Sequence, residues 1–174
     1  MKPSIVCLCL AAAFLVAADD TNIKFEEFAP KGGRFTVQMP PQPKEQTSKV
    51  NTAVGPIDLH NFVCEPDPNT AYIVCYSDYP EEMIKKSDSQ KVLDGVRDGA
   101  VKNVNGKLDW EKKITIDSHA GRDFAFKAER FEGRNRVYLV NARLYQMVLI
   151  GPSKDFITSK DAQRFLDSFK LTDK

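Results

Sequence analysis

The sequence predicts an α+β domain in which an antiparallel β-sheet carries helices on both of its faces. Three observations lead to this fold class. Residues 136–150 have the strongest β-strand pattern in the chain, and they are largely apolar on both faces, so both faces need a cover. Residues 87–104 and 158–169 instead repeat their apolar side chains at helical spacing, and these helices can provide that cover.

Residues 1–18 have the pattern of a secretory signal peptide. Lys2 gives a positive start, residues 5–16 form an unbroken apolar run, and Ala17-Ala18 supplies small residues for cleavage. The apolar run is shorter than the roughly 20 residues that span a bilayer. We therefore predict cleavage after Ala18 and an exported protein, periplasmic or secreted, with retention of the segment as an anchor as the alternative.

The remaining residues, 19–174, have the composition of a single globular domain. Hydrophobic residues make up 42% of the chain, and 11 of them are Phe, so a packed core is expected. Without Lys2 there are 24 basic and 24 acidic side chains, a balance that favours neither nucleic acid nor an anionic membrane as a partner. Only Cys64 and Cys75 remain after cleavage, which is too few for a disulfide framework.

The first half of this domain predicts three strands. Residues 34–39 alternate in polarity after a turn at Gly32-Gly33, and the prolines that follow end this strand. Residues 54–64 and 71–76 are two further strands, and residues 65–70 between them are dense in turn formers. Together these two strands predict an antiparallel hairpin.

Residues 87–104 predict an amphipathic helix. Ser87 begins a capping-box spacing, and Gly106 stands where a helix commonly ends. Gly95 and Gly99 lie one turn apart inside this helix, and each destabilises it by about 1 kcal/mol relative to alanine. We therefore expect a neighbouring element to pack close against the two glycines.

The second half of the domain predicts further strands. Residues 108–116 and 122–131 are strands, and Glu132-Gly133 is expected to turn the chain. Residues 136–150 form either one long strand or a hairpin broken at Asn141-Ala142, because asparagine tolerates the left-handed conformation that such a turn needs.

The chain ends in a helix that Thr158 and Asp161 can cap. Its apolar stripe, which we expect to lie against the sheet, consists of Ala162, Phe165, Leu166 and Phe169.

In the hairpin arrangement, residues 136–150 place the best binding candidates on one sheet face. These candidates are Arg136, Tyr138, Arg143 and Tyr145, and both residue types are enriched in binding hot spots. They form a groove if the covering helix leaves part of this face open. The more ordinary interpretation is a pair of arginines that snorkel over a buried aromatic layer.

His60, Cys64 and Cys75 are the candidates for chemistry. If residues 65–70 form the loop, Cys75 faces His60, and this pair could activate a thiolate in a hydrolase or another thiol-dependent enzyme. The same register separates Cys64 from Cys75 by about 13 Å, so a disulfide needs a bulge or another register. The favoured interpretation is two small buried cysteines in a sheet.

Motifs for metal binding, phosphate binding and nucleophilic catalysis are missing from the sequence. We therefore predict no catalytic residue, no metal site and no cofactor. His119 and Arg122 precede a strand, where they could contact an anion, although a surface turn with a solvated arginine is favoured. The expected function is a non-catalytic module that binds a protein partner or a small molecule, without nucleic acid and without stable membrane insertion after cleavage.

Several segments, in their order along the chain, resemble the PsbP/Mog1-like α/β/α sandwich group. These segments are Phe35–Pro40, Ala71–Pro80, Gly121–Phe124, Arg143–Gln146 and Phe165–Lys170. They recur in small exported bacterial proteins, and the resemblance covers most of residues 25–171. It implies an interaction module rather than a classical enzyme, since the group includes a photosystem accessory subunit and a Ran-binding protein. No functional residue of either protein matches a position of this chain, so none is carried over.

Overall fold

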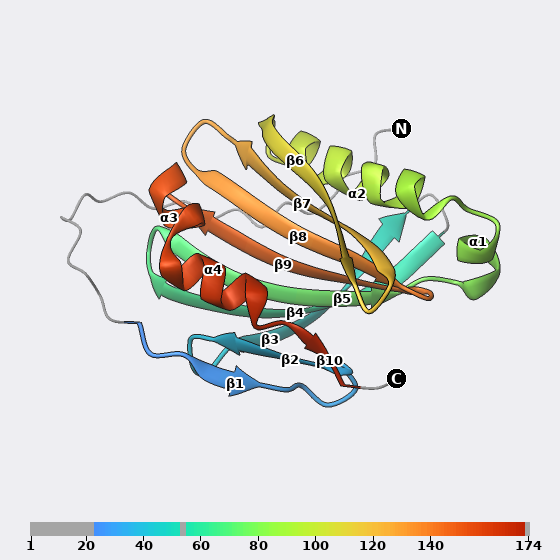
Figure 1. Cartoon of the computed structure of the whole chain (residues 1–174), viewed down its shortest axis with the longest axis horizontal. Helices are drawn as coiled ribbons and strands as arrows, with labels where there is room; N and C mark the ends of the chain where they lie inside the picture. The colour runs from blue at the N-terminus through green and yellow to red at the C-terminus, as the bar shows by residue number, and fades with distance from the viewer. Residues whose placement is uncertain (1–22, 53–54, 173–174) are drawn as a thin grey trace.

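The computed structural model describes residues 23–52 and 55–172 (Figure 1). Seven strands form an antiparallel sheet in the order β3-β4-β5-β9-β8-β7-β6, and three short strands form a second sheet in the order β1-β2-β10. The strands are β1 (Glu26–Phe28), β2 (Phe35–Met39), β3 (Lys44–Thr52), β4 (Gly55–Asp67), β5 (Thr70–Asp78), β6 (Lys107–Ile116), β7 (His119–Lys127), β8 (Glu132–Val140), β9 (Arg143–Gly151) and β10 (Lys170–Leu171). The helices are α1 (Glu81–Lys85), α2 (Ser89–Asn103), α3 (Lys154–Thr158) and α4 (Lys160–Asp167).

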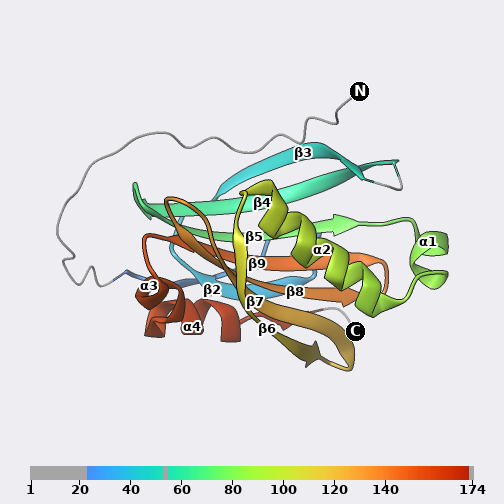
Figure 2. The same cartoon turned by 90° about the horizontal axis from the view of Figure 1, so that it is seen from above.

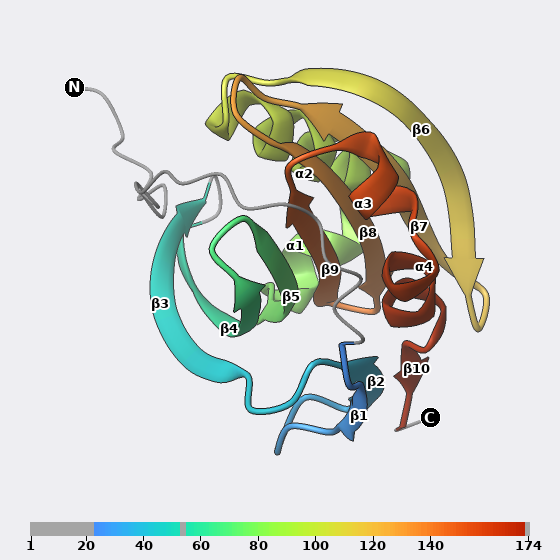
Figure 3. The same cartoon turned by 90° about the vertical axis from the view of Figure 1, so that its left-hand side faces the viewer.

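The large sheet is covered on both faces, which confirms the predicted fold class. Figures 1 and 3 show α2 on one side of this sheet, and α4 with the small sheet on the other. Two apolar cores correspond to these layers. The core under α4 contains Tyr72, Tyr145 and Met147, whereas the core under α2 contains Leu93 and Val137.

The β8–β9 hairpin has the predicted turn and register. Asn141 has φ 53°, the left-handed conformation expected of it, and Tyr138 lies directly opposite Tyr145. Because side chains alternate along a strand, one face of the hairpin contributes Tyr138 and Tyr145 to the core under α4. The other face contributes Val137 and Leu144 to the core under α2.

The structure corrects several predicted boundaries. The helix expected to begin at Ser87 begins at Ser89, because the Asp88 carboxylate accepts hydrogen bonds from two backbone N–H groups of its first turn. Ser159, rather than Thr158 or Asp161, caps α4 by accepting a hydrogen bond from the Ala162 N–H. The expected turn at Glu132-Gly133 is instead the start of β8, and the chain turns within residues 128–131.

Five elements were missed by the sequence prediction, namely β1, β3, α1, α3 and β10. Strands β1 and β10 have three and two residues, which is too short for an alternation to show. Strand β3 is an edge strand of mostly exposed polar side chains, so it lacks the apolar alternation by which a strand is recognised. The two helices have five residues each, which is too short for a helical period to show.

The predicted signal peptide, residues 1–18, lies outside the described residues. Among the helices of the described part, none is long and apolar enough to cross a membrane.

The two glycines of α2 do not have the close neighbour that the sequence suggested. A Cβ atom built on Gly95 or on Gly99 would have no heavy atom of a neighbouring element within 4 Å. The expectation of tight packing is therefore wrong. Both glycines weaken the helix without a packing gain within the domain.

Replacing both glycines by alanine is expected to stabilise the protein by about 1–2 kcal/mol, because alanine has the higher helix propensity and loses less backbone freedom on folding. Thermal unfolding should show a rise in Tm of roughly 2–8 °C. Gly121→Ala is the opposite control, since its Cβ would lie 2.5 Å from the Val137 carbonyl oxygen. A fall in Tm for Gly95→Ala/Gly99→Ala would contradict the open helix face.

Candidate functional site

Two of the predicted binding residues, Tyr138 and Tyr145, lie in a row of directly opposed side chains that crosses the large sheet. The row runs from β3 to β7 through Thr47, His60, Tyr76, Tyr145, Tyr138 and Gly121. Its three tyrosines are at most 6% exposed, because α4 and the small sheet cover them. Gly121 leaves room for the Tyr138 ring, which lies where a Cβ would stand.

Arg136 holds the end of α4 against the sheet. Its guanidinium donates to the Asp123 carboxylate at 2.9 Å, to the Asp167 carboxylate at 2.7 Å and to the Leu166 carbonyl oxygen at 3.0 Å. Tyr138, two residues further along β8, stacks on the Phe169 ring at 6.0 Å between centroids. These two candidates therefore anchor the helical cover.

Arg143 holds the loop before β2 against the large sheet. It forms a bidentate pair with Asp78 at 2.6 and 2.7 Å and donates to the carbonyl oxygens of Gly32 and Gly33. The Tyr145 hydroxyl also donates to the Gly33 carbonyl oxygen, at 3.0 Å. The hydrogen bond from Arg143 lowers the pKa of the Asp78 carboxyl below its ordinary value. This arrangement fits the interpretation of arginines over a buried aromatic layer better than an open groove.

His60 and Cys75 lie on opposite faces of the sheet, so the expected register is wrong by one residue. The strands turn at residues 68–69 with a bulge between Cys64 and Asp67, instead of through a six-residue loop. Cys75 therefore faces Asn61, and His60 stacks on Tyr76 with ring centroids 4.6 Å apart. Burial raises the pKa of the Cys75 thiol to about 12, which is far from a thiolate at neutral pH.

Cys64 and Cys75 are both free, and the same register explains why. Cys64 lies opposite Tyr72, on the face toward the small sheet, whereas Cys75 points to the other side. The Cys64 thiol donates to the carbonyl oxygens of Pro40 and Pro41 at 3.2 and 3.1 Å. The bulge that could have brought the cysteines together leaves them on opposite faces.

Arg122 is not a solvated surface residue, so that interpretation is wrong. It is 2% exposed, and its guanidinium lies 2.6 Å from the Glu111 carboxylate and 2.9 Å from that of Asp94. It also donates to the Gln90 side-chain oxygen at 2.6 Å. These contacts join α2 to β6 and β7, and the hydrogen bond from Arg122 lowers the pKa of the Asp94 carboxyl. The Arg122 guanidinium is occupied by these partners, so it is not open to an anion from solution.

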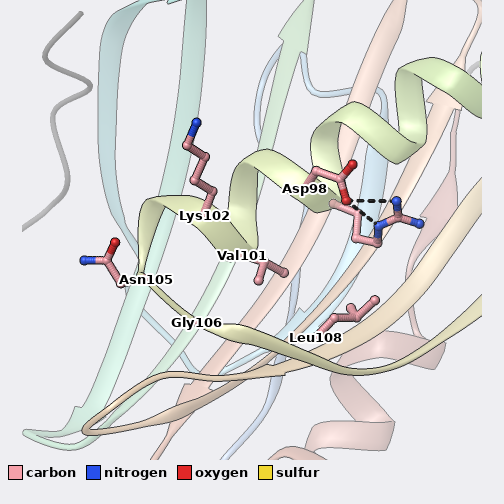
Figure 4. Close-up of a pocket in the computed structure, with 7 residues that line it drawn as sticks. Asp98, Val101, Lys102, Asn105, Gly106 and Leu108 are labelled. Atoms are coloured by element: carbon pink, nitrogen blue, oxygen red, sulfur yellow. Dashed lines mark hydrogen bonds and ion pairs between the residues drawn. The ribbon is translucent and has the colours of Figure 1, made fainter. Parts of the chain in front are cut away.

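A surface hollow lies elsewhere, between the second half of α2 and the start of β6 (Figure 4). It has a volume of about 460 Å³ and is lined by Arg97, Asp98, Val101, Lys102, Asn105, Gly106 and Leu108. We call it the Leu108 groove. Figure 4 shows Val101 and Leu108 pointing into the space between the helix and the strand.

Leu108 is the apolar centre of this groove. It is 43% exposed, and no other large hydrophobic side chain of the described residues is exposed. A bulge between Leu108 and Trp110 puts Leu108 on the same face as α2, and Asp109 within the bulge pairs with Lys154 at 3.0 Å. This site was not predicted from the sequence, in which Leu108 is marked only as an apolar residue near the start of a predicted strand.

The rim of the Leu108 groove is charged, and its positive side chains differ in whether an acidic side chain of the domain pairs with them. Arg97 pairs with Asp98 at 2.8 Å and with Glu111 at 2.6 Å, so its charge is balanced within the domain. Lys102 is exposed and forms no ion pair with another described residue. The groove therefore combines an apolar centre with one uncompensated positive charge, that of Lys102.

Comparisons with known proteins establish the fold and nothing finer. No family model matches the sequence, and no curated protein matches it. Among solved structures, the solution structure of cyanobacterial PsbP (CyanoP) from Synechocystis sp. PCC 6803 is similar, with a TM-score of 0.59 and 10% sequence identity. The match covers 90% of this chain and 98% of that chain, so the protein has a PsbP-like fold.

Proposed function

We propose that this PsbP-like domain is a non-catalytic module that binds a protein partner through the Leu108 groove. The observation that carries the proposal is the exposed Leu108 beside Val101, surrounded by a polar rim. Protein interfaces have this anatomy, in which an apolar anchor is buried at the centre and charged groups lie around it.

The rim indicates the chemistry of the partner. Lys102 favours an acidic segment, and the apolar centre favours one aliphatic or aromatic side chain within that segment. A protein segment suits the groove better than a small molecule, because the groove is bounded by only one helix and one strand. Small-molecule sites usually enclose most of their ligand.

The proposed place of action is outside the cytoplasm, in the periplasm or secreted. Its support is the signal-peptide pattern of residues 1–18, with a short apolar run before Ala17-Ala18. The partner is accordingly expected among exported proteins.

Leu108→Glu is expected to weaken partner binding by about tenfold or more, the usual loss at an interface hot spot. The probe is a set of synthetic peptides with one Leu or Phe flanked by Asp or Glu, titrated into labelled protein and followed by NMR chemical shifts. Peptides flanked by Lys should not bind. Unfolding in urea should change by no more than about 0.5 kcal/mol, since Leu108 is exposed.

Thr115→Glu provides the matched control, because Thr115 is exposed on the same strand, β6, but away from the groove. It should bind the acidic peptides like the wild type. If no acidic peptide shifts the groove resonances, or if Leu108→Glu binds as tightly as the wild type, the proposed function is wrong.

A further inference from the structure

The two edges of the large sheet differ in how they are protected against pairing with another chain. Edge strand β6 carries the bulge before Trp110, and this bulge interrupts its ladder. Edge strand β3 pairs with β4 without irregularity from Lys44 to Thr52, and it contains no proline. A long regular edge presents unpaired N–H and C=O groups to any strand that approaches it. Figure 2 shows β3 at the margin of the sheet, beyond α2.

The backbone geometry of β3 limits how a second copy of this strand could pair with it. In an antiparallel ladder, the groups that point away from β4 belong to every second residue of β3. Two copies running antiparallel therefore pair only about a two-fold axis that passes through one residue. Such an isologous contact closes on itself and makes a dimer rather than a fibre.

Charge selects one of these registers. With the axis at Thr47, Glu45 of each copy lies directly opposite Lys49 of the other, which makes two opposite-charge pairs. With the axis at Glu45 or at Lys49, like charges face each other, which is destabilising. With the axis at residue 46, Glu45 faces the neutral Thr47, and with the axis at residue 48, Lys49 faces it. In both registers the Glu45–Lys49 pairs are lost.

We propose that the protein forms a two-fold symmetric dimer in which β3 pairs antiparallel with β3 of a second copy about Thr47. The two large sheets then join into one continuous sheet. The inference goes beyond the proposed function, because β3 and the Leu108 groove lie at opposite edges of the sheet.

The surroundings of both charged residues are compatible with this pairing. Glu45 lies opposite Phe62 on β4 and forms no ion pair with another described residue. Lys49 contacts the Asp58 carboxylate at 2.9 Å, but both side chains are more than half exposed. An ammonium group has three N–H donors, so Lys49 can contact Asp58 and Glu45 of the second copy together. Lys44 faces Val50 of the second copy, and its methylene stem can cover that half-buried side chain.

Charge complementation tests the register. Glu45→Lys places a second positive charge opposite Lys49 in a homodimer. Lys49→Glu combined with Asp58→Lys places a second negative charge opposite Glu45, while it keeps an opposite-charge pair within the β3–β4 hairpin. Each variant alone has two like-charge pairs, but a mixture of the two variants can form heterodimers with two opposite-charge pairs.

Analytical ultracentrifugation should show that the wild type self-associates, and that each variant alone dimerises about tenfold more weakly. The equimolar mixture should return to within about threefold of the wild-type dissociation constant. Thermal unfolding of each variant shows whether it is folded. Leu108→Glu should leave dimerisation unchanged, so failure of this inference and failure of the proposed function are separable. A wild type that stays monomeric at about 1 mM, or a mixture as weak as its components, would overturn the dimer.

Discussion

Replacing Phe169 by alanine is expected to lower the free energy of unfolding by about 3–5 kcal/mol, as for other buried aromatic residues. Phe169 is 5% exposed and lies where three elements meet. Its ring stacks on Phe35 of the small sheet at 5.2 Å and packs against Tyr145 of the large sheet at 5.4 Å. The substitution leaves a cavity between both sheets and the end of α4, which neighbouring rings fill only in part.

Urea denaturation followed by circular dichroism measures this loss. Phe169→Leu is the control, because it keeps much of the apolar volume and should destabilise the protein less than the alanine variant. A loss well under 1 kcal/mol for Phe169→Ala would show that α4 does not hold the small sheet on the large one.

Asp123→Asn is expected to destabilise the protein by about 3–5 kcal/mol at neutral pH, because it leaves buried positive charge without its partner. Asp123 is 3% exposed and accepts hydrogen bonds from Arg134 at 2.9 and 2.7 Å and from Arg136 at 3.2 and 2.9 Å. Arg134 is itself 7% exposed, so water cannot replace the carboxylate. An asparagine of the same shape removes the charge but leaves the packing.

The same carboxylate predicts a pH dependence. Burial alone raises the pKa of Asp123, but the hydrogen bonds and charges of Arg134 and Arg136 outweigh burial and lower the pKa below its ordinary value. The unfolded chain then binds this proton at a higher pH than the folded protein does. The stability that Asp123 contributes is therefore present above about pH 4, the unfolded pKa, and is lost as the pH falls through the folded value.

Urea denaturation at a series of pH values from neutral to acid tests both points. The gap in stability between wild type and Asp123→Asn should be widest at neutral pH and should narrow below about pH 4. Asp167→Asn is the matched control, because Asp167 pairs with Arg136 but is exposed, and its loss should be within about 1 kcal/mol. Equal losses for the two variants would mean that the Asp123 cluster is not a buried charge network.

The candidate site shows where sequence patterns stop being informative. Leu108 is one apolar residue among many in the sequence, and its exposure depends on the bulge that turns it toward α2. Lys102 becomes part of its rim only because α2 and β6 lie together. The predicted binding cluster on the β8–β9 hairpin, in contrast, is occupied by contacts within the domain. Arg136 and Arg143 are good hot-spot residues by type, but each finds internal partners more than ten residues away.

Local patterns were sufficient for the elements whose structure depends on neighbours in the chain. The hairpin at Asn141-Ala142, the apolar stripe of α4 and the need to cover both sheet faces follow from side-chain period and turn chemistry. Tertiary structure alone decided the pairing across the sheet and the burial of charge. A one-residue shift in register moved Cys75 away from His60, because side chains alternate between faces. Arg122 and Asp123 could be buried only because partners from distant segments balance their charges, and no local pattern records a distant partner.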